Sequence, residues 1–187
     1  MNAYDFDKTI FYPDSSASFY RFCLRRYPAA VWPTIPRSIG MAFGYAAGRI
    51  SAGTLKQQLF SFLPKIPDID RVVEAFWQEN EHRLGDWYLR QRRDDDVIIS
   101  ASPEFLLAPI CKKLGVNLIG TRMDKHSGRI DGNNCHDSEK VRRFEAVYPG
   151  QKPEAFYSDS LSDTPMAEIS GCAYLVNKHR LCPWPKS

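Results

Sequence analysis

The chain opens with MNAYDFDKTI, residues 1–10, and this stretch decides how the rest can be arranged. Residues Ala3 to Phe6 predict a short buried strand that delivers Asp5 and Asp7 at its C-terminal end. Because side chains alternate along an extended chain, the two carboxylates should lie on one side and Phe6 on the other. Two like charges this close need a cation between them, or one of them keeps its proton. The stretch therefore indicates a site, although a solvated acidic turn is the alternative for so short a motif alone.

The composition limits the class of protein. With 187 residues, 43% of them hydrophobic and 13% aromatic, the chain suits one domain with a sizeable insertion or two small domains. A net charge of +3 is too balanced to indicate a nucleic-acid partner, and it is compatible with an anionic substrate. Five scattered cysteines without a CxxC pair suggest neither a disulfide framework nor a zinc site. We expect a reduced, cytoplasmic location, and no secretory signal precedes the acidic strand.

Residues 13–95 predict an inserted bundle of helices. Apolar residues recur there at spacings of three and four, which predicts helices from Ser15 or Ser16 to Arg26, over Ile39–Ala47, from Ala52 or Thr54 to Phe62, and from Ile69 to Leu84 or beyond. The prolines at 28, 33 and 36 should break the chain between the first two helices. The most apolar part, residues 29–50, is too short between its arginines to span a bilayer, so it predicts a buried or interfacial helix.

From Asp96 onward, short apolar runs alternate with helices. The predicted strands are Val97–Ile99, Asn117–Gly120, Ala155–Tyr157 and a last strand Ala173–Val176, and the predicted helices are Pro103–Leu114 and Ser138–Tyr148. This alternation predicts an α/β fold with a doubly wound parallel sheet. The core would comprise residues 1–12 and 96–187, and the helical cap residues 13–95. For the tail, residues 181–185, we expect only a chain end that is either packed against the protein or loose.

In such a sheet the site lies beyond the carboxyl ends of the strands. Polar side chains predicted to meet there are Asp5, Asp7, Ser100, Asp159 and Asp163. A pocket this negative needs a hard cation such as Mg²⁺ and a nearby basic group. Lys140, at the start of a predicted helix, would supply that group, whereas alone it would be read as an exposed helix lysine.

Four short motifs stand in order at these strand ends: DFDKT at 5–9, IISASP at 98–103, EK at 139–140 and SDSLSD at 158–163. In type and order they resemble motifs I to IV of the haloacid dehalogenase-like hydrolase superfamily. The helical insertion between the first two motifs is similar to the C1 cap of its phosphoserine phosphatase-like branch, as are residues 121–123 and 128–130.

The resemblance implies Mg²⁺-dependent hydrolysis of a phosphate monoester through an aspartyl-phosphate. Asp5 would be the nucleophile, and Asp7 the group that protonates the leaving oxygen and then deprotonates water. Mg²⁺ would be held by Asp5, the main-chain carbonyl of Asp7 and Asp159, with Asp163 nearby in support. Lys140 would offset the charge of the nucleophile and of the phosphate.

The same resemblance implies contacts with the substrate. Ser100 would bind the transferring phosphoryl oxygens together with the lysine, and Thr9 and Ala101 are further candidates for the phosphate site. Thr9 would also orient the site through its hydroxyl. Asp14 matches an acid that this branch carries near the leaving group, although an Asp that only caps a helix is an equal alternative.

Departures from the branch concern the substrate. Gln58 stands where phosphoserine phosphatases carry a substrate-binding Arg, Ser162 replaces an Asn, and Ser158 replaces a Gly. Phosphoserine is therefore not the expected substrate. A small phosphometabolite or a lipid phosphate remains, with a phosphotransferase or a non-catalytic phosphate-binding regulatory module as alternative functions.

The first cap helix and the apolar stretch after it also resemble bacterial phosphatidylglycerophosphatase members of the branch. Basic side chains would then face anionic headgroups, and aromatic ones would touch the membrane interface: Arg21, Arg25, Arg26, Arg37 and Arg49 in the first set, Trp32, Phe43 and Tyr45 in the second. An ordinary solvated helix face with core aromatics is the favoured alternative. The oligomeric state is left open.

Overall fold

A computed structural model of the protein describes residues 1–178 and 180–185, so residue 179 and the last two residues of the predicted core lie outside the described residues. Its centre is a six-stranded sheet in the order β3-β2-β1-β4-β5-β6. The strands are β1 (Ala3–Tyr4), β2 (Val97–Pro103), β3 (Asn117–Thr121), β4 (Ala155–Ser158), β5 (Cys172–Asn177) and β6 (Arg180–Pro183). The first five run parallel, which confirms the predicted α/β fold class.

The end of the sheet differs from the prediction. The expected last strand is followed by β6, which pairs antiparallel with β5. All four residues of β6 are exposed, so it carries no alternation of apolar and polar residues from which a strand could be predicted.

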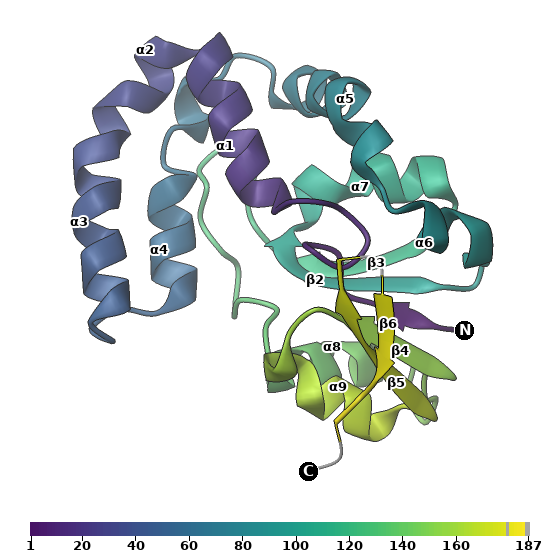
Figure 1. The fold of residues 1–187 in the computed structure, drawn as a ribbon. Helices are drawn as coiled ribbons and strands as arrows, with labels where there is room; N and C mark the ends of the chain where they lie inside the picture. The colour runs from purple at the N-terminus through teal and green to yellow at the C-terminus, as the bar shows by residue number, and fades with distance from the viewer. Residues whose placement is uncertain (179, 186–187) are drawn as a thin grey trace.

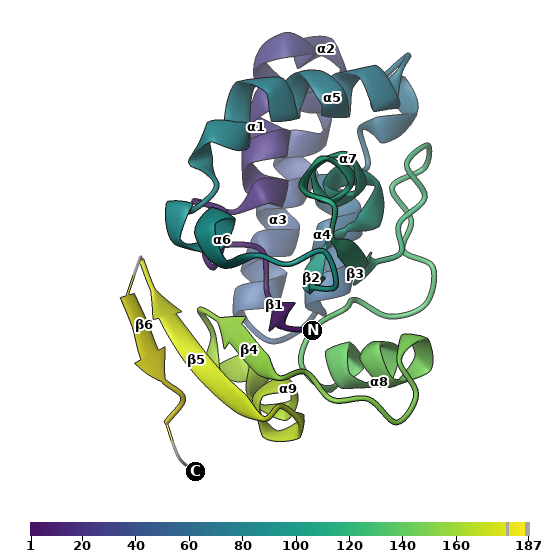
Figure 2. The same cartoon turned by 90° about the vertical axis from the view of Figure 1, so that its right-hand side faces the viewer.

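Helices cover both faces of the sheet (Figures 1 and 2). α6 (Asp86–Gln91) and α7 (Glu104–Leu114) lie on one face, and α8 (Ser138–Val147) and α9 (Thr164–Ile169), a short helix that we did not predict, lie on the other. The strands alternate accordingly. Tyr4, Ile98 and Tyr157 belong to the core on the first face, whereas Ala3 and Phe156 belong to the core on the second.

The first strand is shorter than predicted, because the chain turns sharply at the acidic motif. The amide of Asp5 still donates to the carbonyl of Tyr157 at 2.8 Å. The amides of Ile10 and Phe11 then both donate to the carbonyl of Phe6 at 3.0 Å, and Lys8 takes a positive φ of 58°. This turn places Asp5 and Asp7 at the edge where the strands end.

The insertion is more continuously helical than expected. It contains α1 (Ser15–Arg26), α2 (Pro28–Val31), the 3₁₀ turn η1 (Trp32–Thr34), α3 (Ile35–Ala46), α4 (Ala52–Leu59) and α5 (Ile69–Asn80), with α6 following. The predicted break is present at Pro28, because α1 ends at Arg26 and Tyr27 has a non-helical φ of -132° and ψ of 56°. Pro33 and Pro36, however, begin further helical elements and do not interrupt the helical stretch. Each of the three prolines stands in the first turn of a helix, where its missing N–H is harmless. α3 therefore begins at Ile35 instead of Ile39.

Two parts of the insertion pack differently. α1, α5 and α6 contribute Phe19, Phe76 and Tyr88 to the same hydrophobic core as Tyr4 and Ile98 of the sheet. α2, α3 and α4 form an arm that stands away from the sheet, with α3 outermost and α4 between α3 and the core (Figure 1). The boundary of the cap at residues 13–95 stays a prediction. Within the described residues, none of the helices is long and apolar enough to cross a bilayer.

Candidate active site

A cavity of about 630 Å³ opens at the C-terminal ends of β1, β2 and β4. The site residues predicted from the sequence that line it are Asp5, Asp7, Asp14, Ser100, Ala101, Lys140, Asp159 and Asp163. Its opposite wall comes from α1 and α4, through residues that include Tyr20, Leu55, Lys56 and Leu59. The cavity therefore has a charged floor made by the sheet and a largely apolar wall made by the insertion.

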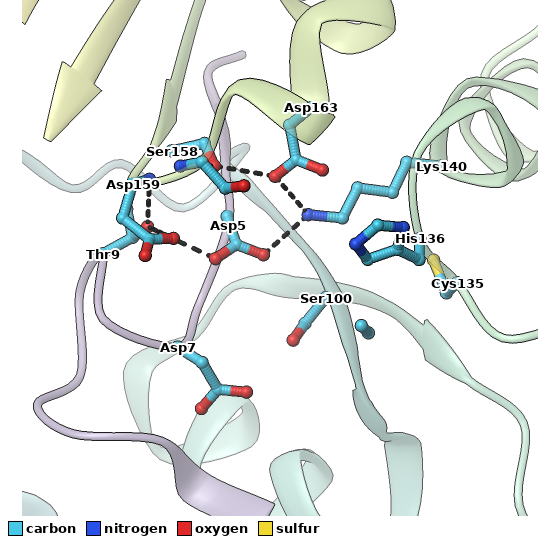
Figure 3. A network of polar contacts seen from close by, with 12 residues as sticks. Asp5, Asp7, Thr9, Ser100, Cys135, His136, Lys140, Ser158, Asp159 and Asp163 are labelled. Carbon is cyan, nitrogen blue, oxygen red and sulfur yellow. Dashed lines mark hydrogen bonds and ion pairs between the residues drawn. The ribbon is translucent and has the colours of Figure 1, made fainter. Parts of the chain in front are cut away.

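A buried ion-paired triad forms the floor (Figure 3). The Lys140 ammonium, 2% exposed, donates to Asp5 Oδ1 at 2.6 Å and to Asp163 Oδ2 at 2.7 Å. Burial lowers the pKa of this ammonium, but the two carboxylates raise it further, so Lys140 remains charged. Since α8 begins at Ser138, the helix start aims Lys140 at the strand ends.

The carboxylates outnumber the cations that pair with them. Burial raises the pKa of Asp5 to about 7, although Lys140 acts in the opposite direction. The pKa of Asp159 is also raised, again chiefly by burial. Within the described chain, neither Asp7 nor Asp159 makes an ion pair. The site thus carries more negative charge than Lys140 alone can balance.

Asp7 is held from two elements at once. Its Oδ1 accepts from the amide of Ser15 at 2.6 Å, and its Oδ2 accepts from Ser102 Oγ at 2.5 Å. Burial, together with the nearby charge of Asp14, raises the pKa of Asp7 to about 6. The start of α1 and the end of β2 therefore fix a carboxyl that gains and loses a proton near neutral pH.

Thr9 lies behind the carboxylates and does not line the cavity. Its Oγ1 donates to Asp5 Oδ2 at 3.3 Å and accepts from the amide of Asp159 at 2.9 Å. The side chain is wholly buried, so the structure favours a positioning role for Thr9 over the predicted phosphate contact.

The remaining predicted residues lie at the cavity wall. Ser100 Oγ accepts from the amide of Ser102 at 3.0 Å, which keeps the hydroxyl proton available for the cavity. The carbonyl of Ala101 accepts from Thr121 Oγ1 at 2.7 Å. Asp14 caps α1 by accepting from the amide of Ala17 at 2.8 Å, and it also lines the cavity; its role near the leaving group stays a prediction.

The fourth motif supplies a further hydrogen-bond donor to the triad. Ser158 Oγ donates to Asp163 Oδ2 at 2.7 Å, so this oxygen has two donors. With Gly at position 158, this oxygen would keep the donor from Lys140 but lose the one from the Ser158 hydroxyl. The departure from the family pattern at Ser158 therefore has a structural role, which is to hold Asp163.

Lys56 of α4 is a site residue that we did not predict. Its Nζ donates to the carbonyl of Ala101 and, at 2.9 Å, to Asn134 Oδ1, both of them uncharged. Burial lowers the pKa of this ammonium, against the nearby charges of Asp7 and Asp14. The predicted helix from Ala52 to Phe62 contained the signal, because Leu55, Lys56 and Leu59 share one face at helical spacing.

Gln58, placed by the sequence where a substrate-binding Arg would stand, has a different environment. It is buried, its amide donates to Ser61 Oγ at 3.3 Å, and it is not among the described residues that line the cavity. The cation that α4 offers to the site is Lys56, two residues earlier.

The cap is joined to the core by the loop before α8. The amide of Ile130 donates to Gln57 Oε1 of α4 at 2.9 Å. Gly128 has a positive φ of 73°, and a Cβ there would lie 2.5 Å from the carbonyl oxygen of Phe60, so only glycine allows this approach. The family-like residues 128–130 therefore position the wall of the cavity.

The donor set fits a Mg²⁺ ion. Among the described residues no group of three or more His, Cys, Asp or Glu side chains is placed to hold a metal ion by itself. Mg²⁺ does not require such a group, because it usually binds through one or two carboxylates together with water and substrate phosphate. Two observations favour a cation here, namely the excess of buried carboxylates and the buried Asp163 Oδ1, which has no hydrogen-bond partner in the described chain.

Comparison with known proteins identified a matching family and a related protein. A family model described as haloacid dehalogenase-like hydrolase matches residues 3–168. Protein CicA of Caulobacter vibrioides is 30% identical over 183 residues, covering 90% of this chain and 82% of that protein.

Solved structures share the fold. A Bordetella pertussis protein of unknown function matches with a TM-score of 0.79 at 22% identity, over 94% of this chain and 88% of that one. A structure described as a phospho-aspartyl intermediate analogue of phosphoserine phosphatase matches with a TM-score of 0.61 at 14% identity, over 92% and 84%. At these identities the likeness shows the fold alone.

Proposed function

Because the chain belongs to the haloacid dehalogenase-like hydrolase family and has the fold of its phosphoserine phosphatase-like branch, we propose that it is a Mg²⁺-dependent phosphatase. The reaction is hydrolysis of a phosphate monoester through a phosphorylated Asp5. The observation that supports it best is the Asp5–Lys140–Asp163 triad on the cavity floor, with Asp7 beside it as a second carboxyl.

In the first step Asp5 attacks phosphorus. Its carboxylate is oriented by Lys140 at one oxygen and Thr9 at the other, so little reorganisation precedes attack. A bond forms between the Asp5 oxygen and phosphorus while the bond from phosphorus to the leaving oxygen breaks. Asp7 gives its proton to that oxygen, and its raised pKa of about 6 suits the role.

In the second step water attacks the aspartyl-phosphate. Asp7, now ionised, takes a proton from the water, and the bond between phosphorus and Asp5 breaks to release phosphate. Ser100 and Lys140 donate to the phosphoryl oxygens in both steps, which stabilises the charge that develops on them. The neighbour described as a phospho-aspartyl intermediate analogue supports this course by analogy.

Asp5, Asp159 and the main-chain carbonyl of Asp7 would hold Mg²⁺, and Asp163 would support them. The ion supplies positive charge that reduces repulsion between the carboxylate and the phosphate dianion.

The substrate is a phosphorylated small molecule or a lipid phosphate. Tyr20, Leu55 and Leu59 offer apolar surface to the leaving group, and Lys56 and Arg21 offer positive charge. A panel of soluble phosphometabolites, phosphoserine included, and micellar lipid phosphates, compared by kcat/KM, would identify the class. A tenfold preference for phosphoserine, about 1.4 kcal/mol of transition-state discrimination, would contradict the sequence argument from Gln58 and Ser162.

A generic aryl phosphate tests the reaction itself. We expect turnover with added Mg²⁺, none after EDTA treatment, and recovery when Mg²⁺ is restored. Turnover that survives EDTA would reject the metal dependence. Binding of orthophosphate without any turnover would instead favour the regulatory module, and faster product release on adding an alcohol acceptor would favour the phosphotransferase.

A further inference from the structure

Charge is distributed unevenly along the chain. No acidic residue occurs between Asp14 and Asp68, so all 22 acidic residues lie outside this segment. The same segment contains seven of the 25 basic residues: Arg21, Arg25, Arg26, Arg37, Arg49, Lys56 and Lys65. It includes the whole α2–α4 arm, which is therefore cationic although the protein as a whole is nearly neutral.

The outermost helix of this arm exposes large apolar side chains. Trp32, Ile39 and Phe43 are 64%, 54% and 73% exposed, and only Ser38 of α3 is buried. Because η1 leads directly into α3, spacings of seven and four place the three side chains along one side of the helix. We refer to Trp32, Ile39 and Phe43 as the α3 stripe.

The other side of α3 faces the protein. Ser38 and Tyr45, also seven residues apart, lie there; Ser38 is buried and Tyr45 lines the active-site cavity. α3 packs against α4, which separates it from the sheet (Figure 1). The α3 stripe thus faces away from the molecule, while the same helix borders the cavity.

Two basic residues of the arm lie near the stripe in sequence, Arg37 between Trp32 and Ile39 and Arg49 after Phe43. Arg37 and Arg49 are exposed, and within the described residues neither makes an ion pair. An exposed apolar row with unpaired basic groups and no acidic ones is the pattern by which amphipathic helices bind anionic membrane surfaces.

We propose that the α3 stripe docks on an anionic lipid bilayer, with the aromatic and aliphatic side chains entering the headgroup region and Arg37 and Arg49 facing lipid phosphates. A second copy of the chain fits the stripe less well, because pairing two arms would bring two cationic segments together. The proposal goes beyond the hydrolysis proposed above, since docking does not require that the substrate be a lipid. Docking would, however, place the Tyr45 side of the cavity near the membrane.

The test is co-sedimentation of the full-length protein with vesicles of phosphatidylcholine, alone or mixed with phosphatidylglycerol. We expect binding to the mixed vesicles only, and weaker binding as salt rises. An Ile39→Ser/Phe43→Ser variant should lose about tenfold or more in partitioning. Its matched control is Leu89→Ser/Val147→Ser, which changes exposed apolar residues far from the arm and should leave partitioning within about twofold.

A second pair of variants tests the charges. Arg37→Gln/Arg49→Gln should weaken binding to the mixed vesicles about tenfold, since each basic residue near such a surface is worth on the order of 1 kcal/mol. Arg90→Gln/Lys112→Gln, exposed basic residues of α6 and α7, is the control and should bind as the wild type does.

Several results would overturn the proposal: no binding to the mixed vesicles at low salt, equal binding to phosphatidylcholine alone, or wild-type binding by the Ile39→Ser/Phe43→Ser variant. A dimer that this variant dissociates in sedimentation equilibrium would assign the stripe to a second copy instead. Aryl phosphate turnover, measured on the same samples, should be equal in all variants. Vesicle binding by a protein without turnover would reject the proposed reaction and leave the docking surface standing.

Discussion

The cavity floor and the α2–α4 arm differ in where they place charged and apolar side chains. At the strand ends Lys140 is buried and paired with Asp5 and Asp163, whereas on the α2–α4 arm Arg37 and Phe43 are exposed and Arg37 makes no ion pair among the described residues. A buried charge network fixes its geometry, so a substitution there should disturb both chemistry and stability. An exposed stripe contributes little to folding, so its role should appear only when a surface is offered to it.

The largest effect is expected at the nucleophile. Asp5→Asn replaces the proposed nucleophilic carboxylate with an amide, whose oxygen is too weak a nucleophile to form the acyl-phosphate, so turnover should fall roughly 10⁴-fold or more. The fold should persist, because the amide occupies the same space. Steady-state kinetics with aryl phosphate, alongside circular dichroism, would measure both. Retention of a large share of the wild-type rate would remove Asp5 from the reaction.

The loss of activity on replacing Asp7 should depend on the leaving group of the substrate. Asp7→Asn cannot protonate the departing oxygen, so alkyl phosphates should lose on the order of 10²–10⁴ in kcat/KM and aryl phosphates much less. The measurement is a series of esters of graded leaving-group pKa. Equal losses across the series would show that Asp7 is not the proton donor.

Lys140 should matter to the fold as well as to the phosphate. Lys140→Met leaves Asp5 and Asp163 buried without their cation, which should cost about 3–5 kcal/mol of unfolding free energy. Lys113→Met is the matched control, since Lys113 makes an exposed pair with Glu81 at 2.6 Å and should cost under about 1 kcal/mol. Urea denaturation of both variants gives the comparison. Similar losses in the two would indicate that burial of the triad carries no special cost.

The raised pKa of Asp7 predicts how stability depends on pH. With the folded pKa at about 6 and the ordinary value at 3.8, the folded state holds more protons between these values, so this group lowers stability as pH rises. In EDTA, Asp7→Asn should therefore be more stable than the wild type by about 1–3 kcal/mol at pH 8, with the difference vanishing near pH 4.

Glu139 provides a control of opposite sign. Its hydrogen bonds from Arg142 and Arg143 depress its pKa to about 2, so its contribution is present above the unfolded value of 4.5 and is lost as pH falls toward 2. Glu139→Gln should be less stable than the wild type at pH 7, and the two should converge in acid. A gain for Glu139→Gln at neutral pH would mean that the electrostatic account is wrong for both residues.

The smallest effect is expected on the arm. Phe43→Ser should change the unfolding free energy by less than about 0.5 kcal/mol, because the side chain is already exposed in the folded state. Phe76→Ser, the same change at a fully buried position of α5, should cost at least about 3 kcal/mol. A large loss for Phe43→Ser would show that the α3 stripe packs against protein.

The sequence by itself determined which residues gather at the cavity floor. Asp5 stands near the end of a predicted strand, and Ser100 and Asp159 each follow one. Because parallel strands end at one edge, their meeting needed no knowledge of side-chain packing. Lys140 followed from the same logic, since an excess of carboxylates requires a basic group. The helices of the insertion were also evident from their periodicity. α3 nevertheless begins at Ile35 and not at the predicted Ile39, because proline is tolerated in the first turn of a helix.

Only the tertiary structure decided what faces the floor and what faces solvent. The helical spacing places Lys56 on one face of α4, but only the packing of α4 against the end of β2 brings its ammonium to the carbonyl of Ala101. An apolar helix such as α3 has the same periodicity whether its outer side is covered or bare, so the exposure of Trp32 and Phe43 depended on which elements pack around it. β6 was missed for the related reason that an exposed edge strand has no buried side to mark its pattern.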